Sequence, residues 1–182
     1  MKVPKAFYKN TKNIKAFVLG CDPTAKDKNG KRLEFEYVFD LGNDKRYFAG
    51  ILKNLELIGL SLDDIYVQNL ITDYQSEETT LNMQWNRTAL ENTPDRKKEF
   101  DEIDPSGTIP VFLTSEILYK VLLKSNHPKH TAKDLYEKAN MVPIPALANE
   151  LGRYLIPLYR HFKYSLKEKE EYKNHVKSIL SK

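Results

Sequence analysis

The chain has little that could cross-link it or anchor it in a membrane. It contains one cysteine, which excludes an intramolecular disulfide framework, an iron–sulfur cluster held by four cysteines and a cysteine-rich zinc site. No apolar run approaches the roughly 20 residues that a membrane-spanning helix needs, and residues 1–5 lack the apolar stretch of a secretory signal. We therefore expect a cytoplasmic protein with no membrane partner.

The composition is that of an ordinary globular domain. The 182 residues are 41% apolar and 30% charged, so we expect a single domain, 1–182, with a sizeable core. The net charge of +4 permits binding to a polyanion but does not require it. Lysines gather near the C-terminus among glutamates, and the simplest interpretation of that pattern is a solvated helix face.

Short apolar runs alternate with helical patterns along the chain. Strands are predicted at 14–20, 65–70, 109–113 and 155–159, and 33–41 is predicted to be a short strand or extended segment. Helices are predicted at 44–58, 94–103 and 166–180, with two more that Ser115 and Thr131 cap. This alternation predicts a three-layer α/β sandwich around a central, mostly parallel four-stranded sheet.

Three polar residues follow three of these strands: Asp22, Asn69 and His161. Ligands of open α/β sheets bind at the carboxyl ends of the strands, so the three side chains are expected to form one site. A carboxylate can activate water, an amide can read the edge of a pyrimidine, and an imidazole can stabilise a developing anion. Each also has a plainer interpretation: an Asx-turn aspartate, a capping amide and a surface histidine.

Other chemistry-bearing residues have weaker patterns. Phe35 and Phe39 are candidates for stacking on a base or for core packing. His127 and His130 lie three residues apart, but the intervening proline and the lack of further nearby ligands argue against a metal, and we expect none. Cys21 has no base near it in the sequence, so we expect a packed small residue rather than a nucleophile.

Taken in order, these motifs resemble the uracil-DNA glycosylase superfamily over residues 14–166. Gly20-Cys21-Asp22-Pro23 is similar to that family's Gly-x-Asp-Pro, and Phe39 is the best match to the aromatic residue that stacks on the flipped base. Val67-Gln68-Asn69 is similar to the strand that ends in a pyrimidine-reading asparagine. The segment that starts at His161 is similar to the histidine motif and the loop that enters the DNA minor groove.

The resemblance implies a uracil-DNA glycosylase-like fold and hydrolysis of the N-glycosidic bond of uracil or a related damaged base in flipped-out DNA. It implies that Asp22 orients water, that His161 stabilises the departing base, and that Asn69, Phe39 and the backbone of Gly20 and Cys21 contact the base. Further contacts to DNA are implied for a set of surrounding residues: a wedge at Tyr164 or Leu166, phosphate contacts at Arg160 and Lys163, and Thr24 where a branch of the family has a methyl-excluding tyrosine.

The resemblance implies no cofactor, DNA as the partner and, we expect, a monomer. The family motif is usually His-Pro-Ser, whereas this chain has His161-Phe162-Lys163. That departure motivates two alternatives: a catalytically inactive nucleic-acid-binding module of the same fold, or a module that binds a small nucleotide at the same sheet edge. In each case Asp22, Phe39, Asn69 and His161 should converge on one cavity, with side chains within about 10 Å of its centre.

Overall fold

A four-stranded parallel sheet forms the centre of the computed structural model, which describes residues 2–181. The strands lie in the order β2-β1-β3-β4, and their bounds are β1 (Ala16–Gly20), β2 (Ile65–Asn69), β3 (Val111–Leu113) and β4 (Leu155–Pro157). Every pairing is parallel, and the register places Gly20 beside Asn69. The prediction of an α/β fold around a mostly parallel four-stranded sheet is confirmed, and all four strands end at the same edge.

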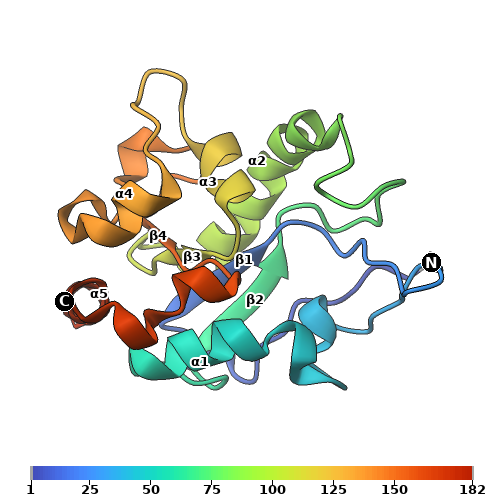
Figure 1. Cartoon of the computed structure of the whole chain (residues 1–182), viewed down its shortest axis with the longest axis horizontal. Coiled ribbons are helices and arrows are strands. Elements are labelled where there is room, and N and C mark those ends of the chain that lie inside the picture. The colour runs from blue at the N-terminus through green and yellow to red at the C-terminus, as the bar shows by residue number, and fades with distance from the viewer. Residues whose placement is uncertain (1, 182) are drawn as a thin grey trace.

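Helices lie along both sides of this sheet (Figure 1). Their bounds are α1 (Ala49–Leu57), α2 (Trp85–Ile103), α3 (Glu116–Leu122), α4 (Ala132–Glu137) and α5 (Glu170–Leu180). Helices α2 and α3 pack together on one side, where Phe17 of β1 stacks on Phe100 of α2 with ring centroids 4.1 Å apart. Helix α1 lies on the other side (Figure 1), so both faces of the sheet are covered and the buried residues of β1 are apolar. The buried residues of β2 include the polar Gln68 and Asn69 at its end. Among residues 2–181, no helix is both long and apolar enough to cross a membrane.

The predicted caps are confirmed, but several predicted boundaries are wrong. The Ser115 and Thr131 side chains accept hydrogen bonds from the first turns of α3 and α4. Residues 33–41 form no strand, but Tyr37 is extended and pairs with Lys5, as the alternative prediction of an extended segment requires. The segment ends in a 3₁₀ turn (η2, Val38–Asp40), where the backbone of Phe39 and Asp40 enters the left-handed region. The helix expected at 44–58 begins at Ala49 after a separate 3₁₀ turn, and the terminal helix begins at Glu170.

Helix α2 begins at Trp85, well before the predicted start at Pro94. Trp85, Ala89 and Thr93 recur every four residues and are all buried, so this half of the helix packs one face against the core. Pro94 removes one helix hydrogen bond, but burial of this face favours the helix over the break that a proline usually causes. The early start matters because it brings the Trp85 side chain to the sheet edge described below.

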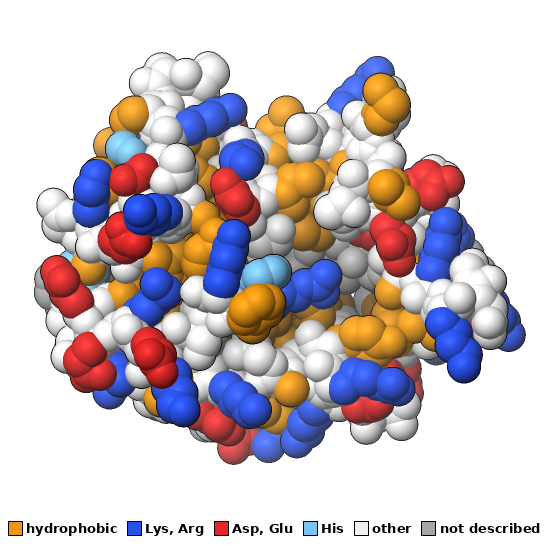
Figure 2. Space-filling model, viewed as in Figure 1, with side chains coloured by type: hydrophobic (Ala, Val, Ile, Leu, Met, Phe, Trp, Pro, Cys, Tyr) orange, Lys and Arg blue, Asp and Glu red, His pale blue; other side chains and the backbone are white. Residues whose placement is uncertain are grey.

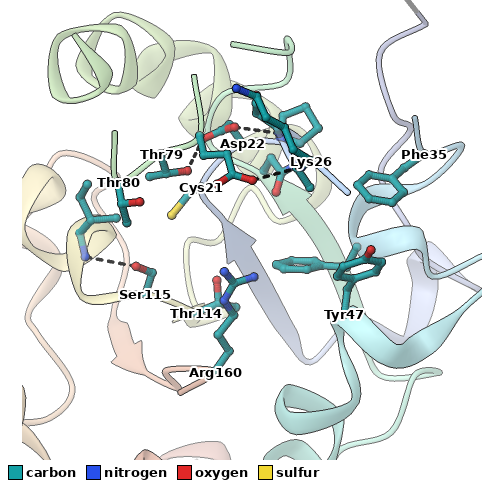
Figure 3. A pocket seen from close by; sticks show the side chains of 17 residues that line it. Cys21, Asp22, Lys26, Phe35, Tyr47, Thr79, Thr80, Thr114, Ser115 and Arg160 are labelled. Carbon is teal, nitrogen blue, oxygen red and sulfur yellow. Dashed lines mark hydrogen bonds between the residues drawn. The ribbon is translucent and has the colours of Figure 1, made fainter. Parts of the chain in front are cut away.

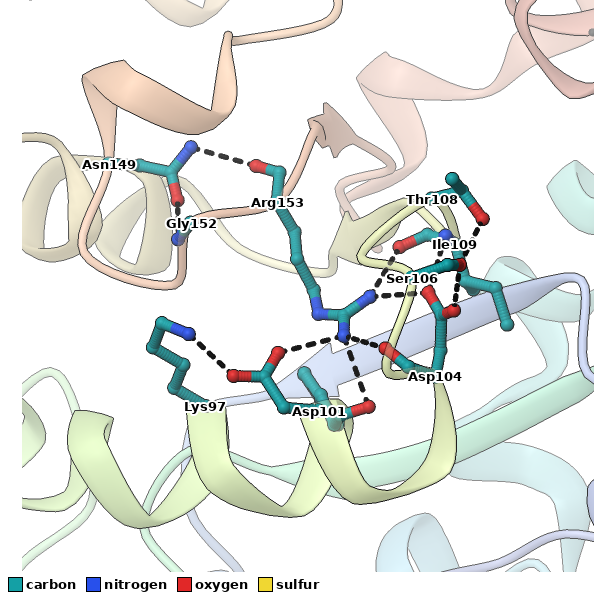
Figure 4. A network of polar contacts seen from close by, with 10 residues as sticks. Lys97, Asp101, Asp104, Ser106, Thr108, Ile109, Asn149, Gly152 and Arg153 are labelled. Carbon is teal, nitrogen blue, oxygen red and sulfur yellow. Dashed lines mark hydrogen bonds and ion pairs between the residues drawn. The ribbon is translucent and has the colours of Figure 1, made fainter.

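A buried arginine joins the end of α2 to the loops that enter β3 and β4 (Figure 4). Arg153 is fully buried, and its guanidinium forms ion pairs with Asp104 at 2.7 Å and with Asp101 at 2.9 Å. It also donates to the backbone carbonyls of Phe100 and Asp104 at 3.1 and 2.6 Å. Because a buried charge is costly without partners, this network fixes the loops at the opposite end of the sheet from the candidate site.

Candidate functional site

One cavity lies where β1, β2 and β3 end (Figure 3). Its volume is about 410 Å³, which is within the usual range for a small-ligand pocket. The residues that line it include Asp22, Phe39, Asn69, Thr114 and Arg160. Asp22, Phe39 and Asn69 were predicted to share a site, and the structure brings these three together.

The carboxylate of Asp22 is held by three donors. Oδ1 accepts a hydrogen bond from the backbone N–H of Thr24 at 2.8 Å, which is the Asx-turn geometry. Oδ2 accepts from the Thr79 hydroxyl at 2.5 Å and from the Trp85 indole N–H at 2.8 Å. A carboxylate offers about four acceptor positions, so one remains for a further donor. Asp22 is therefore both a turn residue and a rigidly oriented acceptor in the cavity wall.

Asn69 is the last residue of β2 and is only 3% exposed. Its backbone N–H donates to the Gln68 side chain at 2.9 Å, but its side-chain amide makes no hydrogen bond with any other of residues 2–181. The amide atoms are reached from the cavity rather than sealed in the core. The donor and acceptor of this amide can therefore pair with a bound ligand, which makes Asn69 the clearest recognition group in the cavity.

Phe39 reaches the cavity through an unusual backbone. Its φ is 57° and its ψ is 21°, in the left-handed region that bulky residues rarely adopt and that costs about 1–3 kcal/mol. Its ring lies against Gly20: a Cβ at that glycine would be 2.8 Å from Phe39 Cζ and 2.3 Å from Asn69 Oδ1. The glycine at the end of β1 thus allows an aromatic face and an amide to meet at one point.

Thr24 and two aromatic residues line another part of the cavity wall. Thr24 is nearly buried, and its hydroxyl accepts a hydrogen bond from the backbone N–H of Gln75 at 2.7 Å. Phe35 and Tyr47 meet edge to face with ring centroids 5.4 Å apart. The cavity wall therefore combines a small polar residue with an aromatic pair.

Cys21 is half-buried in the cavity wall. Burial raises the pKa of its thiol to about 12, although a hydrogen bond with Ser115 and the charge of Arg160 act in the opposite direction. The group therefore stays a protonated thiol at neutral pH, as expected for a packed small residue.

His161 is not among the described residues that line the cavity, contrary to the prediction that it shares a site with Asp22. Strand β4 ends at Pro157, and the chain continues for several residues before this histidine. The imidazole Nδ1 caps the following turn by accepting from the Lys163 N–H at 3.3 Å, and the ring stacks on Phe162 at 4.5 Å. Arg160, which was predicted to contact phosphate, lines the cavity instead.

The loop after β4 also differs from the prediction of a wedge at Tyr164 or Leu166. Leu166 is fully buried, and the ring of Tyr164 stacks on Tyr136 with centroids 4.9 Å apart. Phe162 is the apolar side chain that projects from this loop, with 84% of its surface exposed. Phe162 lies between His161 and Lys163, and an apolar residue between two basic ones was the signal in the sequence that could have indicated it.

Thr79 and Trp85 were not predicted to belong to the site, although both bind the Asp22 carboxylate. They come from the long connection after β2 and from the first turn of α2, so their position depends on tertiary packing. Within residues 2–181, no group of three or more His, Cys, Asp or Glu side chains is arranged to hold a metal ion. No protein-family model, no curated protein and no solved structure matches this chain.

Proposed function

We propose that this protein is a DNA glycosylase that hydrolyses the N-glycosidic bond of uracil or a related damaged base. The observation that carries the proposal is the unpaired amide of Asn69, buried in a cavity that also holds an oriented carboxylate and an aromatic ring. An amide presents a donor and an acceptor side by side, which is the complement of a pyrimidine edge. The Phe39 ring beside it offers a face for base stacking.

The Asp22 carboxylate supplies the hydrolytic part of the reaction. Its remaining acceptor position can hold one water molecule, and the donors Thr24, Thr79 and Trp85 keep the carboxylate from rotating. The water oxygen would add to the anomeric carbon of the sugar while the bond to the base nitrogen breaks. The negative charge of Asp22 also favours the positive charge that develops on the sugar.

The cavity lies within the fold, so the target nucleotide would have to leave the duplex stack. Phe162 projects from the loop after β4 and is the side chain suited to fill the gap that this leaves. Figure 2 shows Lys and Arg side chains over one face with Asp and Glu among them, so this face carries no unbroken basic stripe. DNA affinity would therefore depend on a few phosphate contacts, with Lys163 beside Phe162 as the first candidate.

Excision from a labelled oligonucleotide tests the proposal. The substrates are duplexes and single strands with one uracil, hypoxanthine or 5-substituted uracil, and cleavage of the abasic product by alkali reports the rate. We expect excision of at least one base by the wild type and a loss of about 10²-fold or more in Asp22→Asn, the scale expected when an electrostatic catalytic group is removed. Equal rates for the two proteins would remove Asp22 from the mechanism, and no excision of any base would refute the function.

A catalytically inactive nucleic-acid-binding module is the second candidate. It is favoured by two observations: His161 lies outside the cavity, and Asp22 already accepts three hydrogen bonds. This candidate predicts a salt-dependent gel shift with uracil-containing DNA and no abasic product over long incubation. Measurable turnover would reject it.

A further inference from the structure

Arg160 is an exposed residue whose side chain lines the cavity. Its backbone N–H donates to the carbonyl of Thr114 at the end of β3, at 3.0 Å, which fixes where the side chain starts. Figure 3 shows the guanidinium beside Thr114, on the opposite side of the cavity from Asp22.

Lys26, the other cation in the cavity wall, already has a partner. Lys26 is paired with Glu77 at 3.3 Å, whereas Arg160 makes no ion pair with any of the described residues. The Asp22 carboxylate, which also lines the cavity, accepts its hydrogen bonds from Thr24, Thr79 and Trp85. An unpaired guanidinium facing a partly enclosed cavity is a site for an anion, because it presents several N–H donors in a planar fork.

We infer that Arg160, rather than His161, stabilises the base as it leaves. The inference rests on the proposed function. When the bond between the anomeric carbon and the base nitrogen breaks, its electron pair stays on the base, and the anion spreads onto the ring carbonyl oxygen. The guanidinium donates hydrogen bonds to that oxygen, while water adds to the sugar carbon and releases its proton to solvent by way of Asp22.

His161 cannot take this role in the observed conformation, because its Nδ1 caps the turn and its ring stacks on Phe162 outside the cavity. The two neighbouring residues therefore have separate tasks. Arg160 faces the base, and His161 shapes the loop that presents Phe162.

A comparison of leaving groups tests the inference. Single-turnover excision is measured on duplexes that carry uracil or 5-fluorouracil, whose anion is intrinsically more stable. Arg160→Met should slow uracil excision by about 10²-fold, the usual effect of losing one donor to a developing anion. The same substitution should slow 5-fluorouracil excision much less, a difference that a purely structural or phosphate-binding role would not produce. Arg160→Lys should recover part of the uracil rate.

Two further variants complete the experiment. Lys98→Met removes an exposed positive charge on α2, where Lys98 pairs with Glu102 at 4.0 Å, away from the cavity lining, and it should leave both rates unchanged. His161→Ala should reduce both rates to the same extent, without sensitivity to the leaving group. An equal loss on both bases in Arg160→Met, or a loss sensitive to the leaving group in His161→Ala, would overturn the inference while the proposed function stands. No excision of either base by the wild type would overturn the inference, and a lack of excision of hypoxanthine as well would refute the proposed function.

Discussion

The contact at Gly20 leads to a prediction that the structure makes quantitative. In Gly20→Ala the new Cβ would lie 2.3 Å from Asn69 Oδ1 and 2.8 to 2.9 Å from the Phe39 ring. Ordinary contact begins near 3.4 Å, so the amide and the ring must together give way by about 1 Å. Both belong to the surface that would hold the base. A displacement of that size typically lowers a catalytic rate by about 10²-fold, and overpacking typically costs about 1–3 kcal/mol of stability.

Single-turnover excision and urea unfolding measure the two effects separately. The matched control is Gly50→Ala, because a Cβ there would meet only the Arg160 carbonyl, at an ordinary 3.5 Å, inside helix α1. We expect that control to keep the wild-type rate and to gain up to about 1 kcal/mol from the better helix propensity of alanine. A Gly20→Ala protein with wild-type excision and stability would refute the close approach of Asn69 and Phe39 and the base-binding surface built on it.

Two further predictions concern the groups that hold the fold and the carboxylate. Burial raises the pKa of Asp104, but hydrogen bonds from Ser106, Ile109 and Arg153 outweigh it and lower the pKa from 3.8 to about 2. The folded state thus binds this proton less tightly than the unfolded chain, so about 2 kcal/mol of stability should be lost as the pH falls from 5 to 2. Urea unfolding across that range should show this loss. In Asp104→Asn the unfolding free energy should be lower at pH 6 and should fall less steeply between pH 5 and pH 2. An unchanged dependence on pH in this variant would contradict the assignment to Asp104. Trp85→Phe removes one donor to Asp22, so it should cost about 1.5–3 kcal/mol of stability and slow excision. In a double-mutant cycle with Asp22→Asn, the losses of the two single variants should be coupled. Additive losses would mean that the indole N–H does not act through Asp22.

The sheet could be predicted because its signals are local. Each strand is a short run of buried apolar residues, and the Ser115 and Thr131 caps are written in the few residues around them. The start of α2 could not be predicted in the same way. Its buried face includes Thr93 and Arg96, whose polar character hides the helical period, and Pro94 indicates a break that tertiary packing overrides.

The site, like the fold, could be predicted only where its signals are local. Asp22 and Asn69 follow directly from the rule that parallel strands end at one edge, because each lies within two residues of its strand end. His161 lies farther beyond β4, where the path of the loop decides which side chain faces the cavity, and the loop turns Arg160 inward instead. The contacts of Thr79 and Trp85 with Asp22 join segments more than fifty residues apart, which no local pattern encodes.

The most direct test of the account is a structure of the protein bound to duplex DNA with 2′-fluoro-2′-deoxyuridine at one position. The fluorine slows glycosidic cleavage because it disfavours positive charge on the sugar, so the intact nucleotide can be observed. The account predicts a flipped uracil in the cavity, with its edge hydrogen-bonded to the Asn69 amide, its face on Phe39 and a water molecule on Asp22. A uracil that stays stacked in the duplex, or that binds outside this cavity, would contradict it.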